Sequence, residues 1–549
     1  MEILYGVLLL LAGCGVFMTG MQLLSDGLES SSGKGIRKMF NKISDNRFAG
    51  VSVGAGVTAI IQSSSATTVM VIGFVNAGVM TLIQATAIIM GANIGTTVTG
   101  LLVSFSAFKI GKFLSALALV GVFMMMFSKK DAAKSAGSVM TGLGMIFVGL
   151  DLMGSAFDTS GSLGGVFTEM FGNEAMRFPL LLILLGTVLT AIVQSSSAVT
   201  GVIITMAGVG ILPVLSAFYI VLGTNIGTCI TAILASVGAS TNAKRAALIH
   251  LIFNIFGSVI FAVLLALVGK FFVSTLQILA PDIPAMQVAY FHICFNVVTC
   301  AVLLPFVKQL TQLATKIIKD KPDDGAVEKL YFIDDRILHT PAIAVAQVLK
   351  EVENMRLIAK NNLDRSIGAL LSGDLKDKDK IARDERRLNF INKGIAGFLI
   401  KISALSLNMG DEKLVGSLHH VISDIERIGD HAENFFEEAE TMKERGVTFS
   451  SEAEAELKAM YETVSLAFEK SGDVFRYRDL KGIKDVDVLE AKVDAMKTEF
   501  QNNHIARLNA GNCSVESGSH FYAVISELER VADHLVNIAY SIRPRGDSG

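Results

Sequence analysis

The chain has 549 residues, of which 51% are hydrophobic and 18% are charged, and its formal net charge is −3. This composition excludes a disordered chain, which would be polar and highly charged, and gives no support for nucleic-acid binding, which needs a concentrated basic face. Residues 1–307 hold 24 charged side chains and residues 308–549 hold 75, so we expect a membrane-embedded half followed by a soluble half.

Residues 1–135 are predicted to form a first membrane repeat. The chain begins with an uncharged apolar run from Ile3 to Leu24, which is typical of a retained membrane helix rather than a removed signal peptide. The whole stretch between Arg47 and Lys109 carries no charge but is rich in Gly, Ser, Thr, Asn and Gln. Polar sequence at membrane depth is tolerated where broken helices line a cavity, so we expect a re-entrant hairpin here.

Residues 136–270 are predicted to form a second repeat of the same unit. The segment Gln62-Ser63-Ser64-Ser65-Ala66 recurs as Gln194-Ser195-Ser196-Ser197-Ala198. The segment Gly91-Ala92-Asn93-Ile94-Gly95-Thr96-Thr97 recurs as Gly223-Thr224-Asn225-Ile226-Gly227-Thr228-Cys229, and the two pairs share one offset in sequence. A weaker glycine pattern, Gly13-x-Gly15-x4-Gly20, recurs from Gly142 to Gly149. One duplication explains all three matches. A final membrane helix is expected within residues 271–310.

The charges beside the two copies predict that they are inverted. The loop after the first apolar helix is basic, whereas its equivalent in the second copy is acidic. The basic residues are Lys34, Arg37, Lys38, Lys42 and Arg47, and the acidic residues are Asp151, Asp158, Glu169 and Glu174. The positive-inside rule then places the two loops on opposite sides of the membrane. Inverted repeats are typical of secondary transporters.

The soluble half is predicted to be a linker at residues 311–332 followed by a cytosolic helical bundle at residues 333–549. Its apolar spacing and high charge favour helices. The segment Asp424-x-Glu426-Arg427-x-x-Asp430-His431 recurs as Glu527-x-Glu529-Arg530-x-x-Asp533-His534. We infer two three-helix units, roughly 333–442 and 450–543. The predicted fold is therefore all-α throughout, with a polytopic membrane part and a helical bundle.

The duplicated Gln-Ser-Ser-Ser segments are the candidate binding site for an oxyanion. Serine hydroxyls and glutamine amides donate hydrogen bonds, and helix N-termini at a hairpin tip favour an anion. Neither uncharged block contains Lys or Arg, which suits release of the cargo. A serine oxygen also accepts the O–H of hydrogen phosphate, whereas an arginine cannot. The predicted phosphate ligands are Gln62, Ser63, Ser64, Ser65, Gln194, Ser195, Ser196 and Ser197.

Neighbouring hydroxyl and amide oxygens are candidate ligands for sodium. Such oxygens are hard ligands, and unwound backbone in transporter folds coordinates alkali cations. The sodium candidates are Thr67, Thr68, Asn93, Thr96, Thr200, Asn225 and Thr228, with Gly95 and Gly227 interpreted as flexible points. Asn254 and Asn296 are interpreted instead as interhelical hydrogen-bond partners.

The repeated acidic motif in the soluble half has two interpretations. Glu426 with Asp430, and Glu529 with Asp533, are spaced by one helical turn and share one helix face. With Glu385, or with Glu490 and Asp494, from a neighbouring helix they would bind a divalent or trivalent metal. The alternative is a network of ion pairs with Arg427 and Arg530.

The paired Gln-Ser-Ser-Ser and Gly-x-Asn-Ile-Gly-Thr segments resemble the type II sodium–phosphate cotransporter family. The duplicated (Asp/Glu)-x-Glu-Arg-x-x-Asp-His motif resembles the PhoU phosphate-regulatory domain. The resemblance implies sodium-coupled transport of inorganic phosphate, with the substrate and sodium at Gln62–Ser65 and Gln194–Ser197. It also implies a metal cluster at Glu426, Asp430, Glu529 and Asp533. Asn389 stands where the second unit has Asp494, which is a departure from an equal site in both units.

The expected protein is thus a sodium-driven phosphate transporter of the bacterial cytoplasmic membrane, embedded in the lipid bilayer and adjusted by its cytosolic tail. The tail is expected to sense metal or phosphate state, to pair two copies of the chain, or to bind a cytosolic regulator. Phosphate export by the same fold, and phosphate sensing without transport, stay open as alternatives. A membrane enzyme is disfavoured, since no Ser/His/Asp set, HExxH or nucleotide loop is visible.

Overall fold

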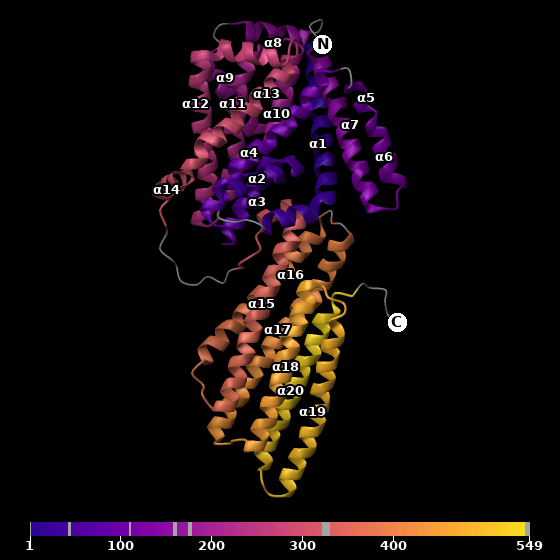
Figure 1. Ribbon diagram of the computed structural model, residues 1–549, viewed down its shortest axis with the longest axis vertical. Coiled ribbons are helices and arrows are strands. Elements are labelled where there is room, and N and C mark those ends of the chain that lie inside the picture. Colours follow the sequence, from indigo (N-terminus) through magenta and orange to yellow (C-terminus); the bar gives the residue numbers. More distant parts are fainter. Residues whose placement is uncertain are drawn as a thin grey trace. The chain divides into compact units, whose positions relative to one another are not determined.

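The computed structural model describes residues 2–41, 46–108, 111–157, 162–173, 178–320, 330–405, 407 and 409–543 (Figure 1). All regular secondary structure in these ranges is helical. The chain forms two compact units, one of residues 1–323 and 334–343, and one of residues 324–333 and 344–549. Several residues used in the sequence predictions lie outside the described part, namely Lys42, Asp158, Glu174 and the linker segment Lys321–Gly325, as do the side chains of Lys34, Arg37 and Lys38.

The helices of unit 1 form two related sets, in each of which a long helix comes first and a hairpin of two short helices is followed by another long helix. The first set is α1 (Glu2–Asn41), α2 (Arg47–Ile61), α3 (Ser64–Asn76), α4 (Leu82–Ser104), α5 (Gly111–Ser115) and α6 (Leu117–Phe127). The second set is α7 (Asp131–Ala156), α8 (Ser162–Gly172), α9 (Pro179–Val193), α10 (Ser196–Gly208), α11 (Val214–Ser236) and α12 (Thr241–Leu279). The unit ends with α13 (Pro284–Leu303), α14 (Val307–Ile317) and the 3₁₀ helix η4 (Asp335–His339).

Helix length divides unit 1 into two classes. Six helical stretches of the described residues are long and apolar enough to cross a membrane: Glu2–Ser32, Leu82–Ala107, Asp131–Ala156, Val214–Ser236, Thr241–Leu279 and Pro284–Ile317. The helices α2, α3, α9 and α10 have only 13 or 15 residues, which is short of the roughly 20 that a span needs. They pair as α2–α3 and α9–α10, each joined by a tight turn.

The two turns have the same backbone because they have the same sequence. Gln62 and Gln194 end their helices in the left-handed region, at φ 57° and 56°. Ser63 and Ser195 follow in extended conformation, and each side chain accepts the N–H of the alanine three positions on. A serine at this position caps the next helix. The duplicated segments therefore specify two matching hairpins.

The Gly-x-Asn-Ile-Gly-Thr segments lie inside continuous helices, α4 and α11, so the interpretation of Gly95 and Gly227 as flexible points in unwound backbone is wrong. These glycines permit close helix packing instead. A Cβ atom at Gly91 would lie 2.1 Å from the carbonyl oxygen of Val51, and one at Gly223 would lie 2.0 Å from that of Ile183. Gly95 and Gly227 are similarly close to α2 and α9.

The helices α1 and α7, which open the two sets, pack along one glycine seam. A Cβ at Gly13 would meet the carbonyl oxygen of Gly149, and one at Gly20 would meet that of Gly142. The partner number falls as the first number rises, so α1 and α7 run antiparallel. The apolar core of unit 1 reaches this seam through Phe17 and Met153. It also includes stacked Phe218 and Phe291, with ring centroids 4.1 Å apart.

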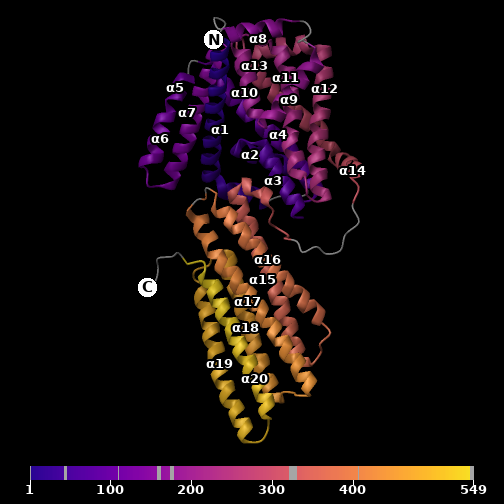
Figure 2. The same ribbon diagram turned by 180° about the vertical axis from the view of Figure 1, so that it is seen from behind.

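Unit 2 contains two successive sets of three helices, whose course can be followed in the two ribbon views (Figures 1 and 2). They are α15 (Pro341–Ser372), α16 (Lys378–Ser403), α17 (Met409–Arg445), α18 (Ser451–Tyr477), α19 (Ile483–Asn509) and α20 (Val515–Tyr540). The third helices of the two sets, α17 and α20, pack against one another.

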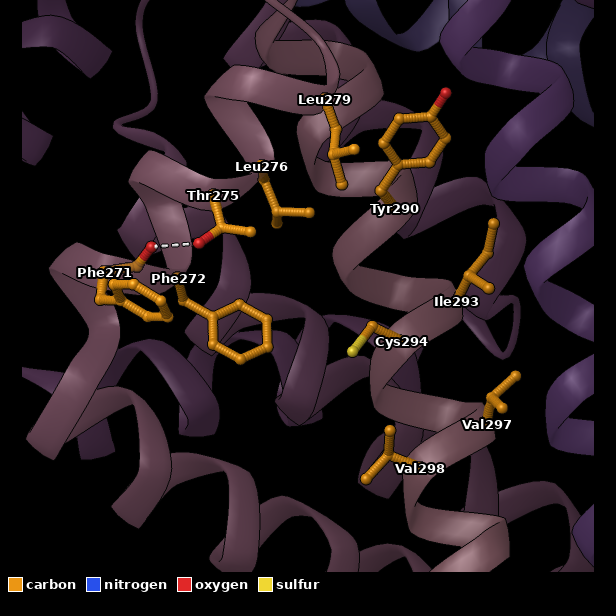
Figure 3. Close-up of a pocket in the computed structure, with 10 residues that line it drawn as sticks. All are labelled: Phe271, Phe272, Thr275, Leu276, Leu279, Tyr290, Ile293, Cys294, Val297 and Val298. Atoms are coloured by element: carbon orange, nitrogen blue, oxygen red, sulfur yellow. Dashed lines mark hydrogen bonds between the residues drawn. The ribbon is translucent and has the colours of Figure 1, made fainter.

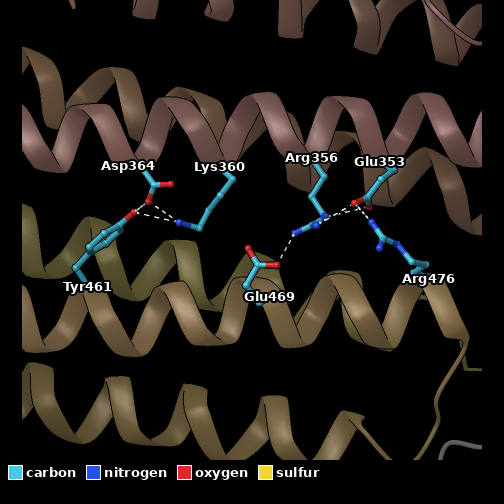
Figure 4. Close-up of polar contacts among 7 residues, drawn as sticks. All are labelled: Glu353, Arg356, Lys360, Asp364, Tyr461, Glu469 and Arg476. Carbon is cyan, nitrogen blue, oxygen red and sulfur yellow. Dashed lines mark hydrogen bonds and ion pairs between the residues drawn. The ribbon is translucent and has the colours of Figure 1, made fainter.

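Polar contacts join the first helices of the two sets, α15 and α18 (Figure 4). Glu353 accepts hydrogen bonds from Arg356 and from Arg476 across the interface. Farther along, Asp364 accepts hydrogen bonds from Lys360 and Tyr461. The ion pairs that hold these two helices together thus involve residues outside the repeated acidic motif.

Candidate substrate-binding site

Both Gln-Ser-Ser-Ser turns line one cavity of about 250 Å³ in unit 1. The tips of the α2–α3 and α9–α10 hairpins therefore meet, although they belong to different repeats of the chain. None of the described side chains that line the cavity carries a charge. They are Phe17, Met18, Met21, Gln22, Ser25, Ile61, Gln62, Ser63, Ser64, Ser65, Gln194, Ser195, Ser196 and Ser197.

The first turns of α3 and α10 border this cavity. Ser64 and Ser196 are 5% and 6% exposed, so their hydroxyls lie within the protein. Because Ser63 caps only the N–H of Ala66, helix geometry leaves the N–H groups of Ser64 and Ser65 without an intrahelical acceptor. The same holds at Ser196 and Ser197 in α10. Two positive helix ends and several neutral donors converge, which is an arrangement suited to an oxyanion.

The two glutamines of the turns differ in their environment. Gln62 is buried, accepts a hydrogen bond from Thr99 at 2.7 Å and donates to the carbonyl oxygen of Ala59 at 2.5 Å. Gln194 is exposed. Thr231, the counterpart of Thr99, bonds to the carbonyl oxygen of Thr228 instead. A hydrogen bond from Thr99 therefore holds the glutamine of the first hairpin tip, whereas Thr231 does not bond to the glutamine of the second.

Helix α1 contributes lining residues that sequence reasoning missed. Ser25 donates to the carbonyl oxygen of Ile61 at 2.6 Å, directly beneath the first hairpin tip. Gln22 also lines the cavity and donates to Asp26 at 2.8 Å. The available signal was the polar series Gln22, Ser25, Asp26 and Glu29 at helical spacing, where the apolar run of α1 ends.

The threonines among the sodium candidates differ in whether their hydroxyl groups already form hydrogen bonds within the described part of the protein. The hydroxyls of Thr68 and Thr200 are buried and have no hydrogen-bond partner in the described part of the chain. Thr67 accepts from Thr58 and donates to the carbonyl oxygen of Ser63. Thr96 and Thr228 donate to carbonyl oxygens one turn back in their own helices. Thr68 and Thr200 are thus the most available of the set.

The asparagines of the repeated segments form matched interhelical pairs. Asn93 donates to Asn254 at 2.7 Å, and Asn225 donates to Asn296 at 2.8 Å. The interpretation of Asn254 and Asn296 as interhelical partners is confirmed. These pairs join α4 to α12 and α11 to α13. The equivalent helices α4 and α11 are therefore bonded to two helices that are consecutive in the chain.

Two larger hollows of unit 1 differ chemically from the serine cavity. One, of about 480 Å³, lies between α12 and α13 and is lined almost wholly by apolar side chains (Figure 3). Its one threonine, Thr275, bonds to the carbonyl oxygen of Phe271, so it has little to offer a phosphate. The other hollow, of about 860 Å³, lies at the end of α10 and includes Lys112, Asp151 and Asp282; we call it the vestibule.

In unit 2 the acidic motif brings carboxylates together at two places. Burial and the neighbouring Asp430, Glu433 and Glu426 raise the pKa of Glu385 to about 7. Burial and Asp494, Asp533, Asp487 and Glu529 likewise raise the pKa of Glu490. In the described residues, however, no three His, Cys, Asp or Glu side chains are arranged to hold a metal ion. Lys497 pairs with Glu529 at 3.0 Å.

The first and last residues of the acidic motif pair reciprocally between α17 and α20. Asp424 contacts His534 at 2.8 Å, and Glu527 contacts His431. The two imidazole rings lie 5.5 Å apart. These pairs explain a part of the repeated motif that the metal interpretation left unused, because they join the two halves of unit 2.

Family models match both halves of the chain. The model described as Na⁺/Pi-cotransporter matches residues 16–155 and 162–280. The model described as PhoU domain matches residues 352–439 and 457–542. The first pair of ranges covers both hairpins and the second pair covers most of both helical sets of unit 2.

The chain is also similar to whole proteins. It is 25% identical over 548 residues to the "Putative inorganic phosphate export protein YjbB" of Escherichia coli K12, a match that covers 98% of both chains. It is 33% identical over 310 residues to the "Uncharacterized protein YqeW" of Bacillus subtilis, covering 56% of this chain and 96% of that protein. A shorter match to the mouse "Sodium-dependent phosphate transport protein 2A" is 38% identical over 98 residues, covering 18% and 15% of the two chains.

Proposed function

The chain belongs to the Na⁺/Pi-cotransporter family and carries a C-terminal PhoU domain, and from this membership we propose that unit 1 is a sodium-coupled carrier of inorganic phosphate. One observation supports the assignment of the site above all others. Two duplicated serine turns, with two helix N-termini, face a single uncharged cavity of about 250 Å³. Phosphate would be held by the hydroxyls and N–H groups of Ser63–Ser65 and Ser195–Ser197, with Gln62 and Gln194 beside them.

Sodium would supply the positive charge that the cavity lacks. An anion bound only by neutral donors and helix dipoles leaves net negative charge in a low-dielectric site, which a co-bound cation compensates. The free, buried hydroxyls of Thr68 and Thr200 lie one turn beyond Ser64 and Ser196 in α3 and α10. They are hard oxygen ligands of the kind that alkali cations prefer, so we propose them as part of the sodium sites. Coupling then follows because neither ion binds well alone.

The hairpins would let the site face either side of the cytoplasmic membrane. From the cavity, α3 runs to Asn76 and α10 runs to Gly208, about 18 Å each at 1.5 Å per residue. The antiparallel α1 and α7 are consistent with inverted repeats, in which such hairpins are re-entrant. We propose that the basic loop after α1 and unit 2 are cytosolic, as the positive-inside rule predicts.

The test is uptake of labelled phosphate by purified, reconstituted full-length protein. We expect uptake to follow an inward sodium gradient and to collapse when potassium replaces sodium. Equal uptake with either cation would contradict the coupling. Substrate accumulation in vesicles also separates transport from phosphate sensing, because a sensor binds phosphate without accumulating it.

Export is the second candidate direction. It is favoured by one finding, the full-length similarity to a protein named as an inorganic phosphate exporter. Phosphate-loaded vesicles separate the two directions: efflux that is fastest with an outward sodium gradient, and uptake with an inward one, would identify one reversible carrier. Efflux that ignores the sodium gradient would identify a distinct exporter.

For unit 2 we propose regulation of the carrier, and the metal assignment stays a prediction. Carboxylate oxygens suit hard divalent or trivalent cations. After incubation with Mn²⁺ and desalting, we expect the parent protein to retain metal by mass spectrometry and Asp430→Asn/Asp533→Asn to retain less. A parent protein without bound metal would contradict the assignment of Glu426, Asp430, Glu529, Asp533, Glu490 and Asp494.

A further inference from the structure

The 3₁₀ helix η4 docks on one end of the transport unit. Asp334, which precedes it, accepts a hydrogen bond from Asn76 at 2.6 Å. Arg336 donates to the carbonyl oxygens of Ala235 at 2.6 Å and Val237 at 3.3 Å, and it pairs with Asp334 at 2.7 Å. The side chain of Ile337 is 1% exposed and lies against Gly73. This short segment therefore contacts the ends of both α3 and α11.

The place where η4 docks is the internal counterpart of the open vestibule. Thr205 and Gly208 of α10 line the vestibule. By the offset that relates the two serine turns, their counterparts in the first repeat are Gly73 and Asn76 of α3, which face η4. The same stretch of α3 and α10 thus borders an open hollow in one repeat and a docked segment in the other.

The other side of the vestibule has a counterpart as well. It includes Asp282, just before α13. Asp282 precedes the segment His292-x-x-x-Asn296 by the same interval that separates Ser240 from His250-x-x-x-Asn254. Ser240 is therefore the counterpart of Asp282, and its N–H donates to Asn76 at 2.6 Å, beside η4.

The two counterparts lie at opposite ends of the unit. Helix α12 starts at Thr241, beside the η4 docking site, and runs to Leu279 with a kink at Val268. A short connection then leads into α13 at Pro284, which lines the vestibule. The serine cavity lies between these ends, because α3 leads from it to η4 and α10 leads from it to the vestibule. One exit is thus an open hollow, and the equivalent exit holds a segment of the chain itself.

We propose that η4 is a plug that closes one of the two exits from the serine cavity, an inference that rests on the proposed transport function. The contacts are specific. Two backbone carbonyl oxygens accept hydrogen bonds from the guanidinium group of Arg336, and the buried side chain of Ile337 packs beside Gly73. The residue after η4 is Thr340, and α15 begins at Pro341. Any change in unit 2 that pulls on α15 is transmitted to the plug over a very short stretch of chain.

The first test measures docking without transport. The full-length Ile337→Cys protein, with its native cysteines, is labelled with a membrane-impermeant thiol reagent, and labelling at residue 337 is followed by peptide mass spectrometry. We expect slow labelling, and an increase of at least about tenfold when Arg336→Ala removes the charge-assisted bonds. Lys316→Ala, at an exposed position of α14, also removes one positive charge and is the control. It should leave the rate of labelling at residue 337 unchanged. Fast labelling before Arg336 is replaced would overturn the plug.

The second test measures transport with the plug locked. Asn76→Cys/Asp334→Cys is oxidised to a disulfide, which replaces the 2.6 Å contact, and phosphate flux is measured before and after reduction. We expect flux to fall at least about tenfold when locked and to return with reductant, while each single cysteine variant is unaffected by oxidant. Full flux in the locked protein would overturn the plug and leave the carrier function standing. If the unmodified parent shows no sodium-dependent flux, the carrier function fails, and the labelling test still decides whether η4 docks.

Discussion

The two hairpins of unit 1 have the same turn but different support. In the first hairpin, α2–α3, Gln62 is buried and bonded to Thr99, and Ser25 of α1 bonds to the carbonyl oxygen of Ile61. In the second, α9–α10, Gln194 is exposed and many apolar side chains of α9, including Ile192 and Leu184, are exposed as well. Equal sequence in the turn thus coexists with unequal packing around it.

This difference in support indicates which hairpin tip is held rigidly and which one is free to change its position. Hydrogen bonds hold the first tip from two directions, so it offers a fixed half of the cavity. The second tip has fewer constraints and its first helix presents an apolar surface suited to lipid. A carrier must rearrange around a bound substrate, and we propose that the hairpin with more support stays fixed while the other one moves.

The largest effect on the stability of unit 1 is expected at equivalent glycines of the two repeats. Gly91→Ala and Gly223→Ala each place a Cβ atom about 2 Å from a backbone carbonyl oxygen, a clash that must push α4 from α2, or α11 from α9. We expect each to destabilise unit 1 by about 3 kcal/mol or more, measured as lower thermal stability in detergent. Gly15→Ala is the control, because a Cβ added there meets no atom of the other described elements within 4 Å. Unequal losses at positions 91 and 223 would mean that the repeats are not packed equivalently.

The next effect concerns the phosphate ligands. Ser64→Ala and Ser196→Ala each remove a buried hydroxyl at the cavity. A hydrogen bond to a charged group contributes about 1.5–3 kcal/mol, so we expect phosphate affinity to fall by at least tenfold in both, measured by the phosphate dependence of flux. Ser274→Ala, on the exposed side of α12, should behave as the parent protein does. A loss in only one variant would show that one hairpin binds the substrate alone.

A smaller effect tests the unequal support directly. Thr99→Val removes the donor that holds Gln62, so the glutamine is no longer preorganised. We expect the KM for phosphate to rise about threefold, an effect of about 0.7 kcal/mol. The matched variant Thr231→Val should leave KM unchanged, because the hydroxyl of Thr231 donates to the carbonyl oxygen of Thr228 in its own helix and not to Gln194. Equal changes in the two variants would contradict the asymmetry between the tips.

Much of this architecture was predictable from the sequence, because it rests on local repetition. The constant offset between the repeated segments identified the paired turns, in which the glutamine ends one helix and the serine caps the next. The glycines of the Gly-x-Asn-Ile-Gly-Thr segments were misinterpreted. The sequence alone does not distinguish a glycine that permits close helix packing from one that permits the backbone to bend. Only the contact with Val51 or Ile183 distinguishes them. The contribution of Ser25 and the docking of Arg336 depend on long-range contacts that no motif encodes.

An effect on stability of similarly small size is expected from one position where the repeats differ in sequence. In the first hairpin Thr58 donates to Thr67, which donates to the carbonyl oxygen of Ser63. In the second, the counterpart of Thr67 is Val199, and the buried hydroxyl of Thr190 has no partner in the described residues. Val199→Thr should complete the same chain of hydrogen bonds and stabilise unit 1 by about 1 kcal/mol, measured as a higher midpoint of thermal unfolding in detergent.

The matched reverse change is Thr67→Val, which should lower that midpoint and leave Thr58 without its acceptor. If the second hairpin is the moving half, the added hydrogen bonds of Val199→Thr should also slow phosphate turnover while the KM stays near that of the parent. Stabilisation without any loss of turnover would contradict that division of roles, because the second tip would then be as rigid as the first and the protein would still transport at full rate.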